Sequence, residues 1–289
     1  MTAGIKRALA APCFAEDPYE LVELGIAAEE AGFDGFFLWD HLMFANDGNG
    51  PPIIDPWLLL ALIAARTEHI RIGTMITPVS RRRPAVLARQ TTTLDLLSNG
   101  RLILGVGIGS PAQGDFGLFG DETDAVLRAE MLDEGLDVLD RLWSGERVDF
   151  QGRHYQVSGV TFQPRPVQRP RIPVWVGGTL PRRRPMSRAA RWDGAVPITW
   201  ADGRLSRPSA EEIAGVRDQV LAERGRLDGF DLAVWAEVAE HPDEVAAELP
   251  GYAEAGATWW IETAKPEPGW LEGLRTRITT AASSRPARP

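Results

Sequence analysis

Short runs of β-branched and aromatic residues alternate along the chain with longer segments in which apolar residues recur at the helical period. Such alternation indicates repeated βα units whose strands form a parallel sheet. The predicted strands are Lys6–Ala11, Gly35–Trp39, Ile70–Thr77, Leu102–Val106, Val174–Gly177, Gly194–Pro197, Leu232–Glu237 and Thr258–Glu262. The predicted helices are Pro18–Ala31, Pro56–Thr67, Pro84–Leu97, Thr123–Trp143, Pro185–Trp192, Pro208–Arg226, Pro242–Ala255 and Trp270–Ala281. Eight units of this kind predict an α/β fold, the (β/α)8 TIM barrel.

Two segments depart from the alternation. Arg147–Arg171 is rich in proline and glycine and contains a candidate hairpin, in which Val148–Phe150 would pair with His154–Val157. We interpret it as an insertion between units four and five. The end of the chain, residues 283–289, is small, polar and proline-containing, which predicts a disordered tail. Residues 1–282 are therefore expected to form a single barrel domain, with the helix after Pro242 kinked or broken at Pro250.

The net charge and the absence of long apolar runs restrict the classes of partner and the cellular location that we expect. The formal net charge of −9 argues against nucleic acid and anionic membranes as partners and favours a small-molecule substrate. The N-terminus lacks the apolar core of a signal peptide, and no run approaches the roughly 18 apolar residues that span a bilayer, so we expect a cytoplasmic protein. Arginine strongly outnumbers lysine, which is typical of GC-rich, for example actinobacterial, genomes.

Motifs for metal binding and for hydrolysis are absent from the sequence. Cys13 is the single cysteine, the histidines are scattered, and neither an HExxH nor a GxSxG pattern occurs. We therefore predict no metal site and no hydrolysis by a serine or metal mechanism.

In a barrel of this type, the active site lies at the carboxyl ends of the strands. Asp40 and His41 end the second predicted strand, so a carboxylate and an imidazole are expected at the mouth, where histidine can exchange a proton near neutral pH. The simpler alternative is that Asp40 caps a loop and His41 is only solvated. Two arginine runs, Arg81–Arg83 and Arg182–Arg184, follow strands three and five; they are either solvated surface or a binding site for an anionic ligand.

Three further strand ends could contact a ligand. The Gly73–Pro78 segment by itself signals only the end of a strand. Gly105–Ser110 is glycine-rich, so a flat ligand or a phosphate could approach its backbone, although it is a weak dinucleotide fingerprint. Val176–Thr179 offers backbone N–H groups and a hydroxyl suited to a phosphate, or is an ordinary glycine turn.

Together these motifs resemble the bacterial luciferase-like family of flavin and deazaflavin oxidoreductases. The resemblance runs in order along nearly the whole chain and is carried by AEEAGFDGFFLWDH (28–41), RRRPAVLARQTTTLDLLSNGRLILGVGIGS (81–110), RIPVWVGG (171–178) and RAARWDGAV (188–196). It implies a (β/α)8 barrel with an insertion and an isoalloxazine-type ring across the barrel mouth.

The resemblance also implies roles for individual residues. His41 and Asp40 resemble the catalytic pair near ring and substrate in the deazaflavin-dependent branch. Thr74 and Met75 resemble a strand-three bulge whose non-proline cis peptide supports the ring. The remaining implied contacts are with the cofactor's ribityl and phosphate groups, and come from Gly107, Ile108, Gly109, Gly177, Gly178 and Thr179.

The expected cofactor is the deazaflavin coenzyme F420, because the Trp-Asp-His motif, the arginine runs facing an acidic cofactor tail and the GC-rich composition all favour it. The resulting hypothesis is an F420-dependent oxidoreductase that transfers a hydride between F420 and a small organic substrate. Two alternatives stay open, an FMN-dependent monooxygenase that uses reduced flavin and oxygen, and a non-catalytic flavin-binding protein. Family members are often homodimers, and the sequence does not settle this point. Ser110 stands where the family's sugar-phosphate dehydrogenases carry glutamate, so such a substrate is not expected.

Overall fold

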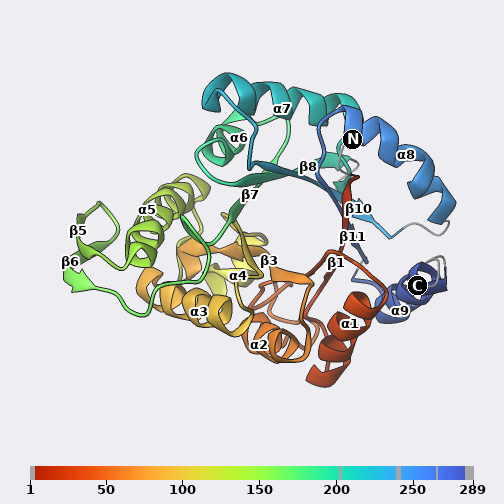
Figure 1. The fold of residues 1–289 in the computed structure, drawn as a ribbon. Coiled ribbons are helices and arrows are strands. Elements are labelled where there is room, and N and C mark those ends of the chain that lie inside the picture. The colour runs from red at the N-terminus through yellow and green to blue at the C-terminus, as the bar shows by residue number, and fades with distance from the viewer. Residues whose placement is uncertain (1–3, 202–203, 239–241, 265, 284–289) are drawn as a thin grey trace.

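A computed structural model describes residues 4–201, 204–238, 242–264 and 266–283 (Figure 1). Eight of its parallel strands follow one another around a closed barrel in the order β10-β11-β1-β2-β3-β4-β7-β8, and β8 pairs again with β10. These strands are β1 (Lys6–Ala11), β2 (Gly35–Leu38), β3 (Arg71–Pro78), β4 (Leu102–Gly107), β7 (Val174–Thr179), β8 (Gly194–Ala201), β10 (Asp231–Glu237) and β11 (Trp259–Thr263). The predicted (β/α)8 barrel is confirmed, with strand ends shifted by at most a few residues.

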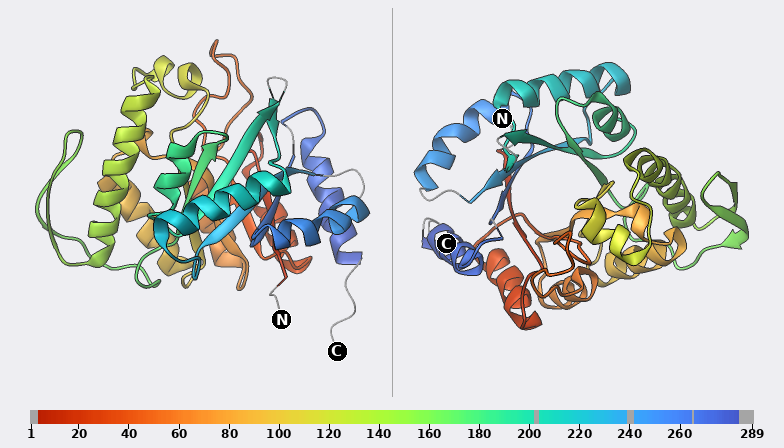
Figure 2. Two further views of the ribbon diagram at one scale, coloured as in Figure 1. Left: turned by 90° about the horizontal axis from the view of Figure 1, so that it is seen from above. Right: turned by 180° about the vertical axis from the view of Figure 1, so that it is seen from behind.

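Helices surround the barrel, as the views along its axis show (Figures 1 and 2). They are α1 (Pro18–Glu30), α2 (Pro56–Arg66), α3 (Pro84–Leu97), α5 (Ala125–Ser144), α6 (Arg183–Ala189), α7 (Ala210–Arg224), α8 (Pro242–Glu254) and α9 (Trp270–Ser283). The first three begin with proline at a position whose N–H would have no partner in any case. The proline rule misplaces α6, which begins two residues before Pro185, and α7, which begins at Ala210 after the N-cap Ser209. Ser209 forms a capping box with Glu212 in the first turn of α7.

The barrel interior is filled by side chains from alternate strand positions, because successive residues of a strand face opposite sides. Large aromatic side chains, Phe37, Trp175 and Trp259, are fully buried there and pack against one another. A second cluster of buried residues lies between the strands and the helices. The interior of the barrel is therefore a packed core, and the large cavity among the described residues lies at its end.

The predicted insertion is confirmed. Strands β5 (Arg147–Gln151) and β6 (Gln156–Thr161) form an antiparallel hairpin that projects sideways from the barrel beyond α5 (Figure 1). Asn99 and Gly100, which follow α3, have left-handed backbone conformations. Helix α8 continues through Pro250, so the helix is not broken at this proline.

Elements that the sequence pattern did not predict lie at the carboxyl ends of the strands. A short helix, α4 (Ala112–Asp115), and a 3-10 turn, η2 (Gly117–Phe119), follow β4, and another 3-10 turn, η1 (Val79–Arg81), follows β3. A short strand, β9 (Arg204–Ser206), folds back antiparallel on β8. These additions, absent from a simple βα alternation, build the rim of the barrel mouth.

The expected tail falls on residues outside the described part of the chain, except for Ser283, which ends α9. Across the described stretches, no helix has both the length and the apolar character needed to cross a bilayer.

Candidate active site at the barrel mouth

A cavity of about 1210 Å³ opens at the carboxyl ends of the barrel strands. Its lining comes from loops and strand ends far apart in sequence, including His41 after β2, Met75 in β3, Ser110 after β4 and Glu237 at the end of β10. A cavity at this end of the barrel has the usual position of a ligand site, and its volume is large enough for a drug-sized ligand or a larger cofactor.

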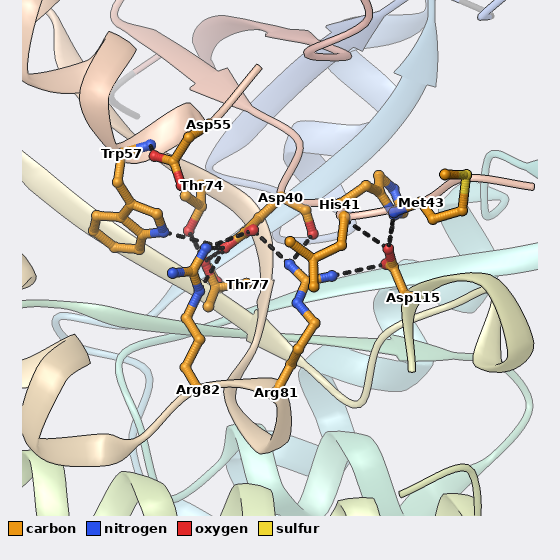
Figure 3. A network of polar contacts seen from close by, with 12 residues as sticks. Asp40, His41, Met43, Asp55, Trp57, Thr74, Thr77, Arg81, Arg82 and Asp115 are labelled. Carbon is orange, nitrogen blue, oxygen red and sulfur yellow. Dashed lines mark hydrogen bonds and ion pairs between the residues drawn. The ribbon is translucent and has the colours of Figure 1, made fainter. Parts of the chain in front are cut away.

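Asp40 is the centre of a buried polar network (Figure 3). Its side chain is only 1% exposed, and its Oδ2 accepts hydrogen bonds from Trp57 Nε1 at 3.1 Å and Thr77 Oγ1 at 2.8 Å. Arg82 donates to both carboxylate oxygens, and Arg81 donates to Oδ1 and to the backbone carbonyl. Burial by itself raises the pKa of the Asp40 carboxyl, but the two guanidinium groups and these hydrogen bonds outweigh it and hold the pKa below its ordinary value. Asp40 is therefore a fixed anion at the base of the site.

His41 lies beside this network and is held by a second buried carboxylate, Asp115 of α4. Its Nδ1 lies 2.7 Å from Asp115 Oδ2, and Asp115 also accepts hydrogen bonds from the backbone N–H groups of Leu42 and Met43 (Figure 3). Arg81 Nη1 lies 3.0 Å from the same Oδ2, so Arg81 bridges the two carboxylates. Because Asp115 also accepts from two backbone N–H groups and lies beside Arg81, we assign the proton of the shared hydrogen bond to His41 Nδ1. The imidazole Nε2 is then the nitrogen left for a ligand.

The two predicted arginine clusters differ in their environments. Arg81 and Arg82 are 2% and 17% exposed and pair with Asp40 and Asp115, so neither of the two predicted readings, solvated surface or anion site, applies to them. Arg182–Arg184 are exposed and line the mouth cavity. No hydrogen bond or ion pair engages these three side chains within the described part of the chain. Of the two clusters, Arg182–Arg184 is the one that lines the mouth cavity, where an anionic ligand would meet it.

Strand β3 carries the predicted irregularity. Its pairing with β4 shifts register between Thr74 and Thr77, and the Met75–Ile76 peptide bond is cis although no proline follows. Met75 and Ile76 line the cavity, whereas Thr74 is fully buried and hydrogen-bonds to the carbonyl of Gly105. The expected non-proline cis peptide is thus present, on the carboxyl side of Met75. Thr74 does not line the cavity and instead links β3 to β4 through its hydrogen bond to Gly105.

The predicted glycine-rich contacts are brought together on one side of the cavity. The residues there that line it are Ile108, Gly109, Gly177, Gly178 and Thr179. Gly107 is buried, and a Cβ at this position would lie 2.0 Å from the Ile76 side chain. Gly109 has a φ of +79°, and a Cβ there would lie 2.7 Å from the Phe116 ring. At Gly109 the positive φ and the neighbouring ring therefore favour glycine whatever ligand the cavity holds, whereas at Gly107 a shift of the flexible Ile76 side chain could make room for a Cβ.

An aromatic wall faces these glycines. Phe44 and Trp39 flank the His41 ring at centroid distances of 5.1 Å and 6.0 Å, and Trp39 also packs against Trp235 of β10 at 6.1 Å. Trp39, Phe44 and Trp235 line the cavity together with Trp200 of β8. The mouth is thus lined by glycine-rich segments and exposed arginines after β4 and β7, and by aromatic side chains from β8, β10 and the loop after β2.

Sequence reasoning missed Asp115 and the aromatic wall. Asp115 lies in a short helix that no periodicity marks, 74 residues from its partner His41. Phe44 and Trp235 look like ordinary core residues in sequence, and only barrel closure brings them together. Within the described part of the chain, no group of three or more histidine, cysteine, aspartate or glutamate side chains could hold a metal ion.

Comparison with known proteins identifies the family. A family model described as luciferase-like monooxygenase matches residues 4–286. The chain belongs to this luciferase-like family. Among curated proteins, it is 36% identical over 234 residues to an F420-dependent glucose-6-phosphate dehydrogenase from Microbacterium testaceum, which covers 80% of this chain and 67% of the relative. A protein of the same name from Nakamurella multipartita is 31% identical over 298 residues, covering 90% and 84%.

Solved structures share the fold. An F420-dependent secondary alcohol dehydrogenase in complex with an F420-acetone adduct superposes with a TM-score of 0.74 at 17% identity, covering 97% of this chain and 99% of that one. The coenzyme F420-dependent tetrahydromethanopterin reductase from Methanopyrus kandleri superposes with a TM-score of 0.71 at 18% identity, covering 96% and 98%. At such identities the likeness concerns the fold of this luciferase-like protein.

Proposed function

We propose that this luciferase-like protein is an oxidoreductase that transfers a hydride between coenzyme F420 and a small organic substrate at the barrel mouth. The observation that carries the proposal is the position of His41, which lies in the cavity wall with Nδ1 fixed by Asp115 and the other ring nitrogen left for a ligand. The names of the two relatives described above support F420 as the cofactor.

The cavity suits a deazaflavin cofactor by the chemistry of its donors. A long anionic cofactor needs backbone N–H groups and cations along its path. Residues 177–179 supply backbone groups and the Thr179 hydroxyl, and Arg182–Arg184 supply positive charge at the rim. Met75 and Ile76 at the β3 bulge supply an apolar surface for a flat ring. When bound, the deazaflavin would supply the hydride chemistry.

The chain's own residues would handle the proton and the orientation of the substrate. His41, with Nδ1 donating to Asp115, would accept or return a substrate proton at Nε2. Asp40 was predicted to join His41 as a catalytic residue. Since its oxygens accept from Trp57, Thr77, Arg81 and Arg82, we propose a positioning role for it, in which it fixes Arg81 beside Asp115.

The substrate is proposed to differ from that of the relatives named above. Ser110 lines the cavity at the position where glutamate was expected for a sugar-phosphate dehydrogenase. Glucose 6-phosphate is therefore expected not to reduce F420 bound to this protein. Bleaching of F420 by glucose 6-phosphate at the enzyme would contradict this part of the proposal.

Titration of the purified chain tests the cofactor. Oxidised and reduced F420 and FMN would be compared by fluorescence and by the shift in melting temperature, because a ligand selective for the native state raises that temperature. Selective F420 binding supports the proposal. Preference for reduced FMN with consumption of oxygen would indicate a monooxygenase instead. A His41→Ala variant that binds F420 normally and loses turnover would exclude a non-catalytic flavin-binding role.

A further inference from the structure

A second, small cavity of about 80 Å³ adjoins the mouth on its aromatic side. The two cavities share Trp39, Leu205, Trp235, Glu237 and Pro266 as lining residues. Strand β9, which supplies Leu205, covers this side chamber. The space is sufficient for roughly two or three water molecules or for one small functional group of a larger ligand.

Three residues that line this side chamber carry buried hydrogen-bond donors without a partner among the described residues. Trp235 and Thr263 are 7% and 4% exposed, and Trp235 Nε1 and Thr263 Oγ1 have no hydrogen-bond partner within the described part of the chain. Trp39 Nε1 is likewise buried and unpartnered. Thr263 continues the inward-facing series of Trp259 and Ile261 on β11, so its side chain also faces the barrel axis. Buried donors without acceptors cost free energy, and such groups call for an acceptor from water or ligand.

The surroundings of these donors define the acceptor that fits. Indole N–H and hydroxyl groups are neutral, and the walls that Trp39, Leu205 and Trp235 provide are apolar. Arg207, a charged residue of the same lining, pairs with Glu248 at 2.7 Å and lies over the Tyr252 and Trp260 rings. The exposed cations Arg182–Arg184 line only the larger cavity, whereas the carboxylate residue Glu237 lines both cavities, so the side chamber disfavours an anionic group.

We propose that this side chamber is a substrate subsite for an uncharged oxygen, a carbonyl or a hydroxyl, carried on an apolar carbon frame. Trp235 and Thr263 donate to this oxygen, while Phe44 and Trp200 contact the carbon frame in the larger cavity. The inference rests on the proposed function and narrows its substrate class. It favours a neutral, hydrophobic ketone or alcohol over a phosphorylated sugar.

The test compares two probes with the same carbon frame, cyclohexanone and methylenecyclohexane, which differ by an oxygen in place of a CH2 group. Their dissociation constants would be measured by ligand-observed NMR on the full chain, with and without bound F420. We expect the wild-type protein to prefer cyclohexanone by about three- to tenfold, which is the effect of a neutral hydrogen bond. Trp235→Phe and Thr263→Val each reduce this preference, and the double variant brings the ratio close to one.

Two control variants distinguish the loss of a hydrogen bond in the side chamber from a general loss of core packing. Trp175→Phe and Thr92→Val remove the same groups from buried, unpartnered side chains that line neither cavity. These variants are expected to retain the wild-type preference. Equal binding of the two probes to the wild type, no binding of cyclohexanone, or equal losses in the controls would overturn the subsite. Displacement of cyclohexanone by glucose 6-phosphate that depends on Trp235 would also overturn it.

The cofactor measurement keeps the two proposals apart. F420 affinity would be determined by fluorescence on the same samples. If F420 fails to bind the wild type, the proposed function fails, whereas the ratio of the two probes on the cofactor-free chain still reports on the side chamber. If F420 binds and the ratio is insensitive to Trp235 and Thr263, the subsite alone is wrong.

Discussion

His41 and Asp115 lie 74 residues apart in the chain, and their side chains meet at 2.7 Å in the wall of the mouth cavity. The pair is assembled by the short helix α4, which places a fully buried carboxylate against the loop after β2. A histidine held in this way has one defined tautomer and one nitrogen available for proton exchange.

Asp115→Asn should lower turnover by about tenfold to a hundredfold, because a misoriented imidazole loses part of the benefit of acid–base catalysis. The amide can donate to Nδ1 and favour the wrong tautomer. The measurement is kcat against pH with a turned-over substrate, together with an NMR titration of the His41 ring. Asp121→Asn changes an exposed aspartate a few residues away and should leave both unchanged. An unaltered pH profile in Asp115→Asn would show that the pair has no role in proton transfer.

Asp40→Asn should destabilise the fold at neutral pH by about 3–5 kcal/mol, because it leaves Arg81 and Arg82 buried without their anion. Urea unfolding at pH 7 measures this loss, and the exposed Asp47→Asn serves as the control.

Stability of the wild type relative to Asp40→Asn should depend on pH in the acid range. The folded-state pKa of Asp40 is depressed, so its contribution is fully present above the unfolded value near 4 and is lost as the pH falls through the lower folded value. The difference in unfolding free energy should therefore be constant from pH 7 to pH 5 and shrink below about pH 4. A difference that grows on acidification would mean that Asp40 is not held as a buried anion.

Alanine substitutions of Arg182, Arg183 and Arg184 should weaken F420 binding, by about two- to fivefold each, since exposed charge pairs contribute little individually. The loss should diminish at high salt, where such attractions are screened. Fluorescence titration at two ionic strengths measures the effect. Arg226→Ala, which removes an exposed cation in the loop after α7, should leave the affinity unchanged.

Gly109→Ala should cost more stability than Gly120→Ala, although both glycines have nearly the same positive φ, +79° and +77°. A Cβ at Gly109 meets the Phe116 ring and Pro78, whereas nothing lies within 4 Å of one at Gly120. We expect about 1–2 kcal/mol for the backbone conformation in both variants and about 1–3 kcal/mol more for the clash at Gly109. Thermal unfolding of both variants gives the comparison, and equal costs would contradict the packing at Gly109.

The barrel and its insertion could be predicted from the sequence, because the period of the βα units, the prolines at the starts of α1 to α3 and the turn after α3 are local signals. The candidate site could be predicted in part for the same reason. His41, Met75 and Gly177–Thr179 follow strands, and strand ends of a parallel barrel converge on one mouth.

The rest was decided by tertiary structure. An arginine at the mouth is available to a ligand only if no carboxylate of the protein pairs with it. Arg81 pairs with Asp40 and Asp115, which come from separate loops, whereas Arg182 lines the cavity. Likewise, Trp235 and Thr263 become neighbours of one small cavity only when β10, β11 and β9 are in place. The sequence by itself determined the barrel strands, the helices around them and their order, since periodicity and capping act over a few residues. Barrel closure determined the charge pairs and the cavities, because these depend on distances between segments that are far apart along the chain.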